Sequence, residues 1–124
     1  MELPQKPEGL IATYPEWLVM WALLYKMGKK IDFEFQSAQL GGRMTKGGAV
    51  LDFYLPAYGL AINVQGEYWH YQSSRDIAVN RIQRAALEGY GITVIYIDES
   101  DLMRNPVFYV SDALKGKDHS LMSR

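Results

Sequence analysis

Apolar residues recur at the spacing of an α-helix near the start of the chain. The residues at that spacing are Leu18, Trp21, Ala22 and Tyr25. Thr13 is followed three residues later by Glu16, which is the pattern of a capping box, and Pro15 suits the first turn of a helix. Gly28 is typical of a helix end, because glycine adopts a left-handed backbone without a steric penalty. We therefore predict a largely apolar first helix that is well buried.

The pattern then changes to a period of two, which is typical of strands with one buried face. It predicts strands over residues 31–36, 49–55 and 60–65. The short turn at 57–59 indicates that the last two form an antiparallel hairpin. Residues 41–48 contain four glycines and are predicted to form a flexible loop or the tip of a hairpin.

A surface loop, a helix, a strand and a final helix are predicted next. Residues 67–74 are polar and aromatic, as expected of a loop, and serine at 73 or 74 can cap a helix that ends near Gly89. The inner face of that helix is predicted to consist of Val79, Ile82 and Ala86. Residues 92–97 are continuously apolar and β-branched, which favours a central strand covered on both sides. A turn or short helix at 98–104 and a final helix at 106–114 complete the order.

This order predicts an α/β (α+β) fold in which a mixed sheet is flanked by helices on both faces. The 124 residues suit one domain, which we place at 14–115 between an irregular arm at 1–13 and a flexible tail at 116–124. The chain has no cysteine, which excludes a disulfide framework, a thiolate zinc site and a cysteine nucleophile. No apolar run reaches the roughly 20 residues of a membrane span, so we expect a cytoplasmic protein without a membrane partner. The formal net charge of -1 requires any nucleic-acid contact to be made by a local patch.

Asp52 is the first candidate for chemistry, because it is an acid inside an otherwise apolar strand. It either points to solvent or acts as a metal ligand at a strand edge, since hard cations prefer carboxylate oxygen. Asn63 and Gln65 share one face of the next strand, and in a hairpin that face could meet Asp52. His70 could serve as a general base or hold a water, or it could be a loop histidine packed on Trp69.

Two further acids and several basic residues have both structural and functional interpretations. Glu16 and Asp76 each fall in the first turn of a predicted helix, where a carboxylate caps backbone amides. Trp69 could stack on bases or contact another protein. The basic residues that could contact phosphates, or form ordinary solvated surface, are Arg43, Lys46, Arg75, Arg81 and Arg84.

The order of these motifs is more specific than any one of them. The motifs are Glu16, residues 52–56 (DFYLP), 60–66 (LAINVQG), 68–70 (YWH), Arg75-Asp76, Arg81 and 91–95 (GITVI). Over residues 14–102 the chain resembles the PD-(D/E)xK nuclease superfamily, and within it the branch of very-short-patch-repair endonucleases and related homing endonucleases. The resemblance implies a restriction-endonuclease-like fold, a mixed sheet flanked by helices.

The resemblance also implies Mg²⁺-dependent (or Mn²⁺-dependent) hydrolysis of a DNA phosphodiester. It gives the metal to Asp52 and the backbone carbonyl of Val64, and it retains His70 from the two histidines that assist in the branch. Gln65 stands where the first of those histidines falls, and it could donate a hydrogen bond to phosphate. Glu16 matches the acid on the first helix of the branch, and Asp76 is matched to its later acid.

Two hypotheses follow from this pattern. In the first, the protein is a hydrolase, a metal-dependent DNA endonuclease whose partner is DNA. In the second, the nuclease fold has lost catalysis, because Asn63 and Gln65 replace the charged groups of the broad superfamily. It would then serve as a structural or assembly module, for example in a phage particle or a nucleoprotein complex, and it would bind protein partners or its own copies.

Overall fold

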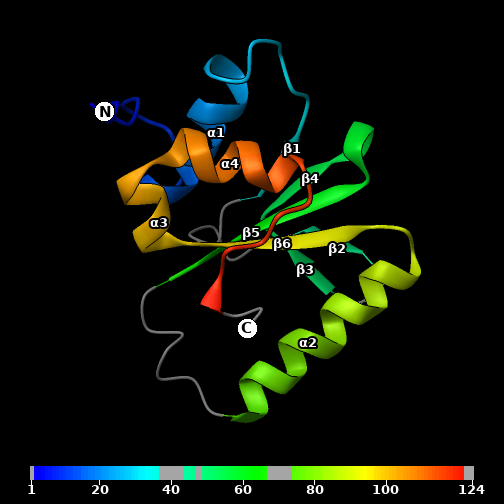
Figure 1. The fold of residues 1–124 in the computed structure, drawn as a ribbon. Helices are drawn as coiled ribbons and strands as arrows, with labels where there is room; N and C mark the ends of the chain where they lie inside the picture. The colour runs from blue at the N-terminus through cyan, green and yellow to red at the C-terminus, as the bar shows by residue number, and fades with distance from the viewer. Residues whose placement is uncertain (1, 37–43, 47–48, 67–73, 122–124) are drawn as a thin grey trace.

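The computed structural model describes residues 2–36, 44–46, 49–66 and 74–121, which form a mixed α/β fold (Figure 1). A four-stranded mixed sheet contains β1 (Glu34–Phe35), β4 (Phe53–Leu55), β5 (Leu60–Gln65) and β6 (Thr93–Asp98), in that order. The α-helices of the described ranges are α1 (Tyr14–Tyr25), α2 (Ser74–Gly89), α3 (Glu99–Arg104) and α4 (Pro106–Leu114). A separate antiparallel hairpin pairs β2 (Met44–Lys46) with β3 (Ala49–Leu51).

The helices cover both faces of the sheet, as the sequence predicted. Figure 1 shows α1, α3 and α4 on one side and α2 on the other. Each face has its own core, because alternate residues of a strand point to opposite sides. Ile62, Ile95 and Ile97 belong to the core that contains α1, whereas Val94 and Tyr96 pack in the core that contains Leu87 of α2.

The first helix begins as its sequence pattern predicts. The Thr13 hydroxyl accepts a hydrogen bond from the Glu16 amide at 3.2 Å, and a Glu16 carboxylate oxygen accepts one from the Thr13 amide at 2.7 Å. These reciprocal bonds form a capping box, and Pro15 occupies the first turn. The helix is buried over most of its surface, although Tyr25 at its end is 67% exposed rather than part of the apolar face.

The sheet combines antiparallel and parallel pairs. The predicted hairpin is confirmed: β4 and β5 are antiparallel with Phe53 opposite Ile62, and the 3-10 turn η2 (Pro56–Tyr58) connects them. The strands β5 and β6 are parallel with Asn63 beside Tyr96, and α2 makes the crossover between them. The predicted strand over 31–36 is limited to β1, and the predicted strand over 49–55 is divided into β3 and β4 at Asp52.

Two expectations about the second half are wrong. The strand β6 is at the end of the sheet order and is not central, although its side chains from Val94 to Asp98 are buried. Its continuous apolar pattern reflects helices on both faces, which a sheet's outermost strand can also have. Ile82, expected on the inner face of α2, is 69% exposed, whereas Leu87 of the same helix is 1% exposed.

The segment beyond α4 lies against β6. We placed residues 116–124 in the tail, and the described part of that tail, up to Leu121, makes hydrogen bonds to the rest of the domain. Ser120 is 1% exposed. At the other end of the chain, the irregular arm also packs on the domain, because the Tyr14 hydroxyl donates to the Pro4 carbonyl at 2.6 Å. Among the described residues, no helix has the length and apolarity needed to cross a bilayer.

Candidate functional site

Asp52 lies at the break between β3 and β4 and is only 3% exposed. Its side chain is therefore not a solvent-facing acid of a regular strand. One carboxylate oxygen, Oδ2, accepts a hydrogen bond from the Val64 amide at 2.9 Å. The Asp52 amide donates to Oδ1 of Asn63, also at 2.9 Å. Hydrogen bonds between side chains and backbone amides thus take the place of backbone–backbone hydrogen bonds where the β4–β5 pairing ends.

The structure brings Asn63 to Asp52, as the predicted hairpin of residues 49–55 and 60–65 suggested. Gln65 lies two residues further along β5, beside Asp98 of β6. In an extended strand the N–H and C=O of one residue point to the same edge. The carbonyl of Val64 therefore lies on the same side of β5 as its amide, which is the side of Asp52.

Tyr96 is a neighbour of this region that sequence reasoning missed. It is buried in the α2-side core, and burial raises the pKa of its hydroxyl. The guanidinium of Arg84 lowers this pKa, whereas the charges of Asp118 and Asp52 raise it. Charges from α2, from the segment beyond α4 and from the break between β3 and β4 therefore act on the same phenol. No local pattern could reveal this, because Tyr96 reads as one more apolar position of a buried strand.

Glu16 has a structural role in this structure. Its carboxylate caps α1 through the Thr13 amide and is 3% exposed. Among the described residues, no group of three or more histidine, aspartate or glutamate side chains is placed to hold a metal ion. Within the part of the chain that the structure describes, Asp52 and Glu16 therefore belong to no such cluster.

Several predicted site residues lie outside the described part of the chain. His70, Trp69 and Arg43 fall in ranges that the structure does not describe. The backbone of Lys46 lies in β2, and those of Arg75 and Asp76 lie in the first turn of α2, but their side chains are likewise outside the description. Their roles stay predictions.

The two remaining basic candidates have different surroundings. Arg81 is exposed on α2. Arg84 is half-buried and faces β6, where its Nη2 donates to the Val94 carbonyl at 2.8 Å and to Oδ2 of Asp118 at 2.9 Å. Its guanidinium also lies over the ring of Tyr96, 5.1 Å from the centroid. Arg84 is thus held against the sheet rather than extended into solvent.

A divalent ion fits these groups only in part. Asp52 supplies one carboxylate, and the Val64 carbonyl lies on the same side of β5. Magnesium is commonly bound through one or two carboxylates together with substrate phosphates and water. The described residues therefore fit an ion that is held jointly with a phosphate, more than an ion enclosed by protein ligands alone.

No protein-family model, curated protein or solved structure matches this chain.

Proposed function

We propose that the protein is a metal-dependent DNA endonuclease of the short-patch-repair and homing endonuclease type. The observation that carries the proposal is the contact between the Asp52 carboxylate and the Val64 peptide. Asp52 immediately precedes the second strand of the four-stranded sheet, and the resemblance gives the metal-binding aspartate to that strand. The resemblance also gives the second ligand to Val64, on the neighbouring strand.

Each of these residues would have its own role in hydrolysis. Asp52 and the Val64 carbonyl would hold Mg²⁺ or Mn²⁺, which when bound polarises a phosphate and lowers the pKa of a bound water. His70 would accept or deliver the proton, and Gln65 would donate a hydrogen bond to a phosphate oxygen. Asp76 would hold the hydrated metal or orient His70. Because a single carboxylate holds the metal, we expect metal affinity to rise strongly when DNA is present.

The test is cleavage of duplex, nicked and branched DNA with Mg²⁺ or Mn²⁺ by the full chain and by matched variants. Asp52→Asn retains an oxygen that can accept from the Val64 amide but removes the charge, and it should abolish cleavage. Asp32→Asn makes the same charge change at an exposed position and should leave cleavage unchanged. Cleavage that persists in Asp52→Asn, or is absent from the wild-type protein on every substrate, would contradict the proposal.

Glu16→Gln separates a capping role from a catalytic one. Glutamine is accepted at this position of a capping box, so the helix start is preserved. If Glu16 acts only as a cap, the variant should cleave at the wild-type rate. A large loss of cleavage in a variant with unchanged melting temperature would give Glu16 a direct role instead.

A second candidate function is a catalytically inactive domain that serves in assembly. The observation that favours it is that the groups offered to the metal already have structural partners: Asp52 with Val64, Asn63 with Asp52, and Glu16 with Thr13. It predicts that Mg²⁺ with DNA leaves the melting temperature unchanged, and that the protein forms an oligomer or a stable complex. A monomer that turns over DNA would exclude this candidate.

A further inference from the structure

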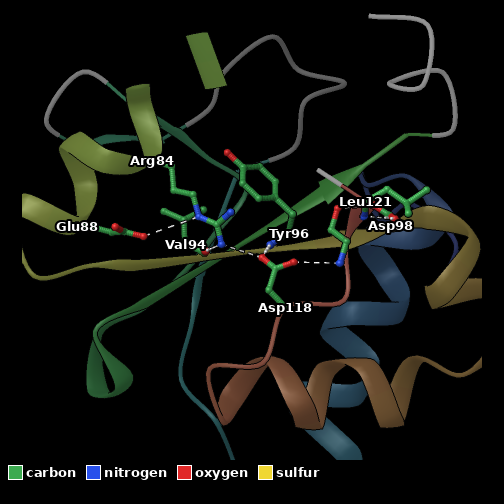
Figure 2. Close-up of polar contacts among 8 residues, drawn as sticks. Arg84, Glu88, Val94, Tyr96, Asp98, Asp118 and Leu121 are labelled. Atoms are coloured by element: carbon green, nitrogen blue, oxygen red, sulfur yellow. Dashed lines mark hydrogen bonds and ion pairs between the residues drawn. The ribbon is translucent and has the colours of Figure 1, made fainter. Parts of the chain in front are cut away.

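The carboxylate of Asp118 is bound by nitrogen donors from three parts of the chain (Figure 2). Its Oδ2 accepts from Nη2 of Arg84 at 2.9 Å and from the Tyr96 amide at 3.0 Å. Its Oδ1 accepts from the Ser120 amide at 2.9 Å. The Asp118 side chain is 11% exposed and that of Arg84 is 21% exposed, so this ion pair is largely withdrawn from water.

Neighbouring contacts hold the segment that carries Asp118. The Ser120 hydroxyl donates to Oδ1 of Asp98 at 2.6 Å, and the Leu121 amide donates to Oδ2 of the same carboxylate at 3.1 Å. Nε2 of His119 lies 2.8 Å from Oδ2 of Asp112 on α4. Residues 118–121, which we call the C-terminal strap, are therefore fixed along the outer edge of β6.

The donors that Asp118 occupies are those with which proteins bind phosphate. A guanidinium and a backbone N–H that converge on one anionic oxygen form charge-assisted bonds to a phosphate as well as to a carboxylate. Arg84 also contacts Glu88, but at 3.8 Å and with the glutamate 54% exposed, which makes that ion pair weak. Of these two carboxylates, Asp118 makes the shorter and less exposed contact to the guanidinium.

This donor pair is connected to the candidate metal site through β5. Tyr96, whose amide donates to Asp118 and whose ring lies against Arg84, is beside Asn63 of β5, and Oδ1 of Asn63 accepts from the Asp52 amide. The sequence pattern alone also proposed Arg84 as a phosphate contact, but it could not identify a competing carboxylate.

We propose that Arg84 and the Tyr96 amide form a phosphate-binding pair that Asp118 occupies in the free protein. The C-terminal strap and the backbone of a nucleic acid then compete for the same donors, so the strap is autoinhibitory. This inference deepens the proposed function by assigning one phosphate contact, but it concerns binding and does not require cleavage.

The test measures binding of a labelled DNA duplex to the full chain by fluorescence anisotropy, with EDTA present so that no metal contributes. Asp118→Asn should bind roughly threefold to tenfold more tightly than wild type at low salt, because the carboxylate charge that competes with a phosphate for Arg84 is removed. Its log–log salt dependence should steepen by about 0.9, the value for one added phosphate contact. The matched control is Asp101→Asn, which removes the same charge on α3, where Asp101 pairs with Arg104.

Further variants make the result decisive. Adding Arg84→Gln to Asp118→Asn should remove the gain in affinity. Ser120→Ala leaves every charge in place but weakens the strap, and it should also tighten binding; it decides the question if Asp118→Asn does not fold. The proposal would be overturned if the Asp118 and Asp101 variants bound DNA with equal affinity. If Asp118→Asn does not fold, it would be overturned by a folded Ser120→Ala that binds DNA with wild-type affinity. A gain in binding in this assay, together with no cleavage by the wild-type protein in the separate Mg²⁺ and Mn²⁺ assays, would refute the endonuclease and leave the phosphate pair standing.

Discussion

Replacing Asp52 by alanine tests whether this acid stabilises the sheet, in addition to its proposed role as a metal ligand. The substitution removes the acceptor of the Val64 amide and leaves the bond from the Asp52 amide to Asn63 possible. The Val64 N–H then faces a space that a 3%-exposed side chain filled. A buried donor without an acceptor is costly, because it loses its hydrogen bonds to water on folding.

The expected loss follows from two opposing effects. A hydrogen bond to a charged group contributes about 1.5–3 kcal/mol to stability. Removing a buried carboxylate also relieves the cost of taking its charge out of water. Since the alanine variant leaves the amide donor behind, the lost bond dominates, and we expect a decrease in the free energy of unfolding of about 2 kcal/mol. For a chain of this length, that corresponds to a melting temperature lower by roughly 6–10 °C.

Urea and thermal unfolding, followed by circular dichroism, measure this loss against two references. Asp52→Asn keeps an acceptor for Val64 and should lose less than half as much stability as the alanine variant. Asp32→Ala, at an exposed position, should be close to wild type. If Asp52→Ala is as stable as Asp32→Ala, the hydrogen bond to Val64 does not support the sheet and the reasoning is wrong.

Three other predictions concern residues away from Asp52. Thr13→Ala should lower the free energy of unfolding by about 1 kcal/mol through loss of the capping box, whereas Thr13→Ser should be nearly neutral in the same urea titration. Gly59→Ala should lower the melting temperature more than Gly9→Ala. Both glycines have positive φ, but of the two only Gly59 would place its new Cβ against a neighbour, the Gly91 carbonyl oxygen at 3.3 Å. Equal melting temperatures of the two variants would contradict this. The hydrogen bond from His119 lowers the pKa of Asp112, so the ionised acid stabilises the fold above its ordinary pKa and this contribution is lost as the pH falls through the lowered value. Asp112→Asn should therefore melt below wild type at neutral pH and converge with it in strong acid, and a difference that is constant with pH would refute the linkage.

Most of the helices and strands could be predicted because their signals are local. The start of α1 depends on two side chains and two amides within four residues, so the Thr13–Glu16 pattern was sufficient. The alternation in 60–65 and the apolar run in 92–97 likewise predicted β5 and β6 within a residue. The pairing of Asp52 with Asn63 was also accessible, because a short turn fixes the register of a hairpin.

The candidate site was predicted less completely than the fold. Asp52 and Val64 were proposed as metal ligands from their place in the motif; the structure joins them through the Val64 amide, and the metal role stays a prediction. Tyr96 was missed, since a tyrosine in a buried strand has the pattern of a core residue. The partner of Arg84 was missed for a different reason: Asp118 is 34 residues away in the sequence, in a segment whose composition indicated a tail.

The amino-acid sequence by itself determined most of the helices and strands and the alternation of faces, because backbone hydrogen bonding and side-chain direction are set by neighbours a few residues apart. Only the tertiary structure decided that β6 is an outer strand and that Asp118, with the strap that carries it, lies along its edge. Those choices depend on contacts between distant segments, whose free energy is gained only when the whole sheet has assembled.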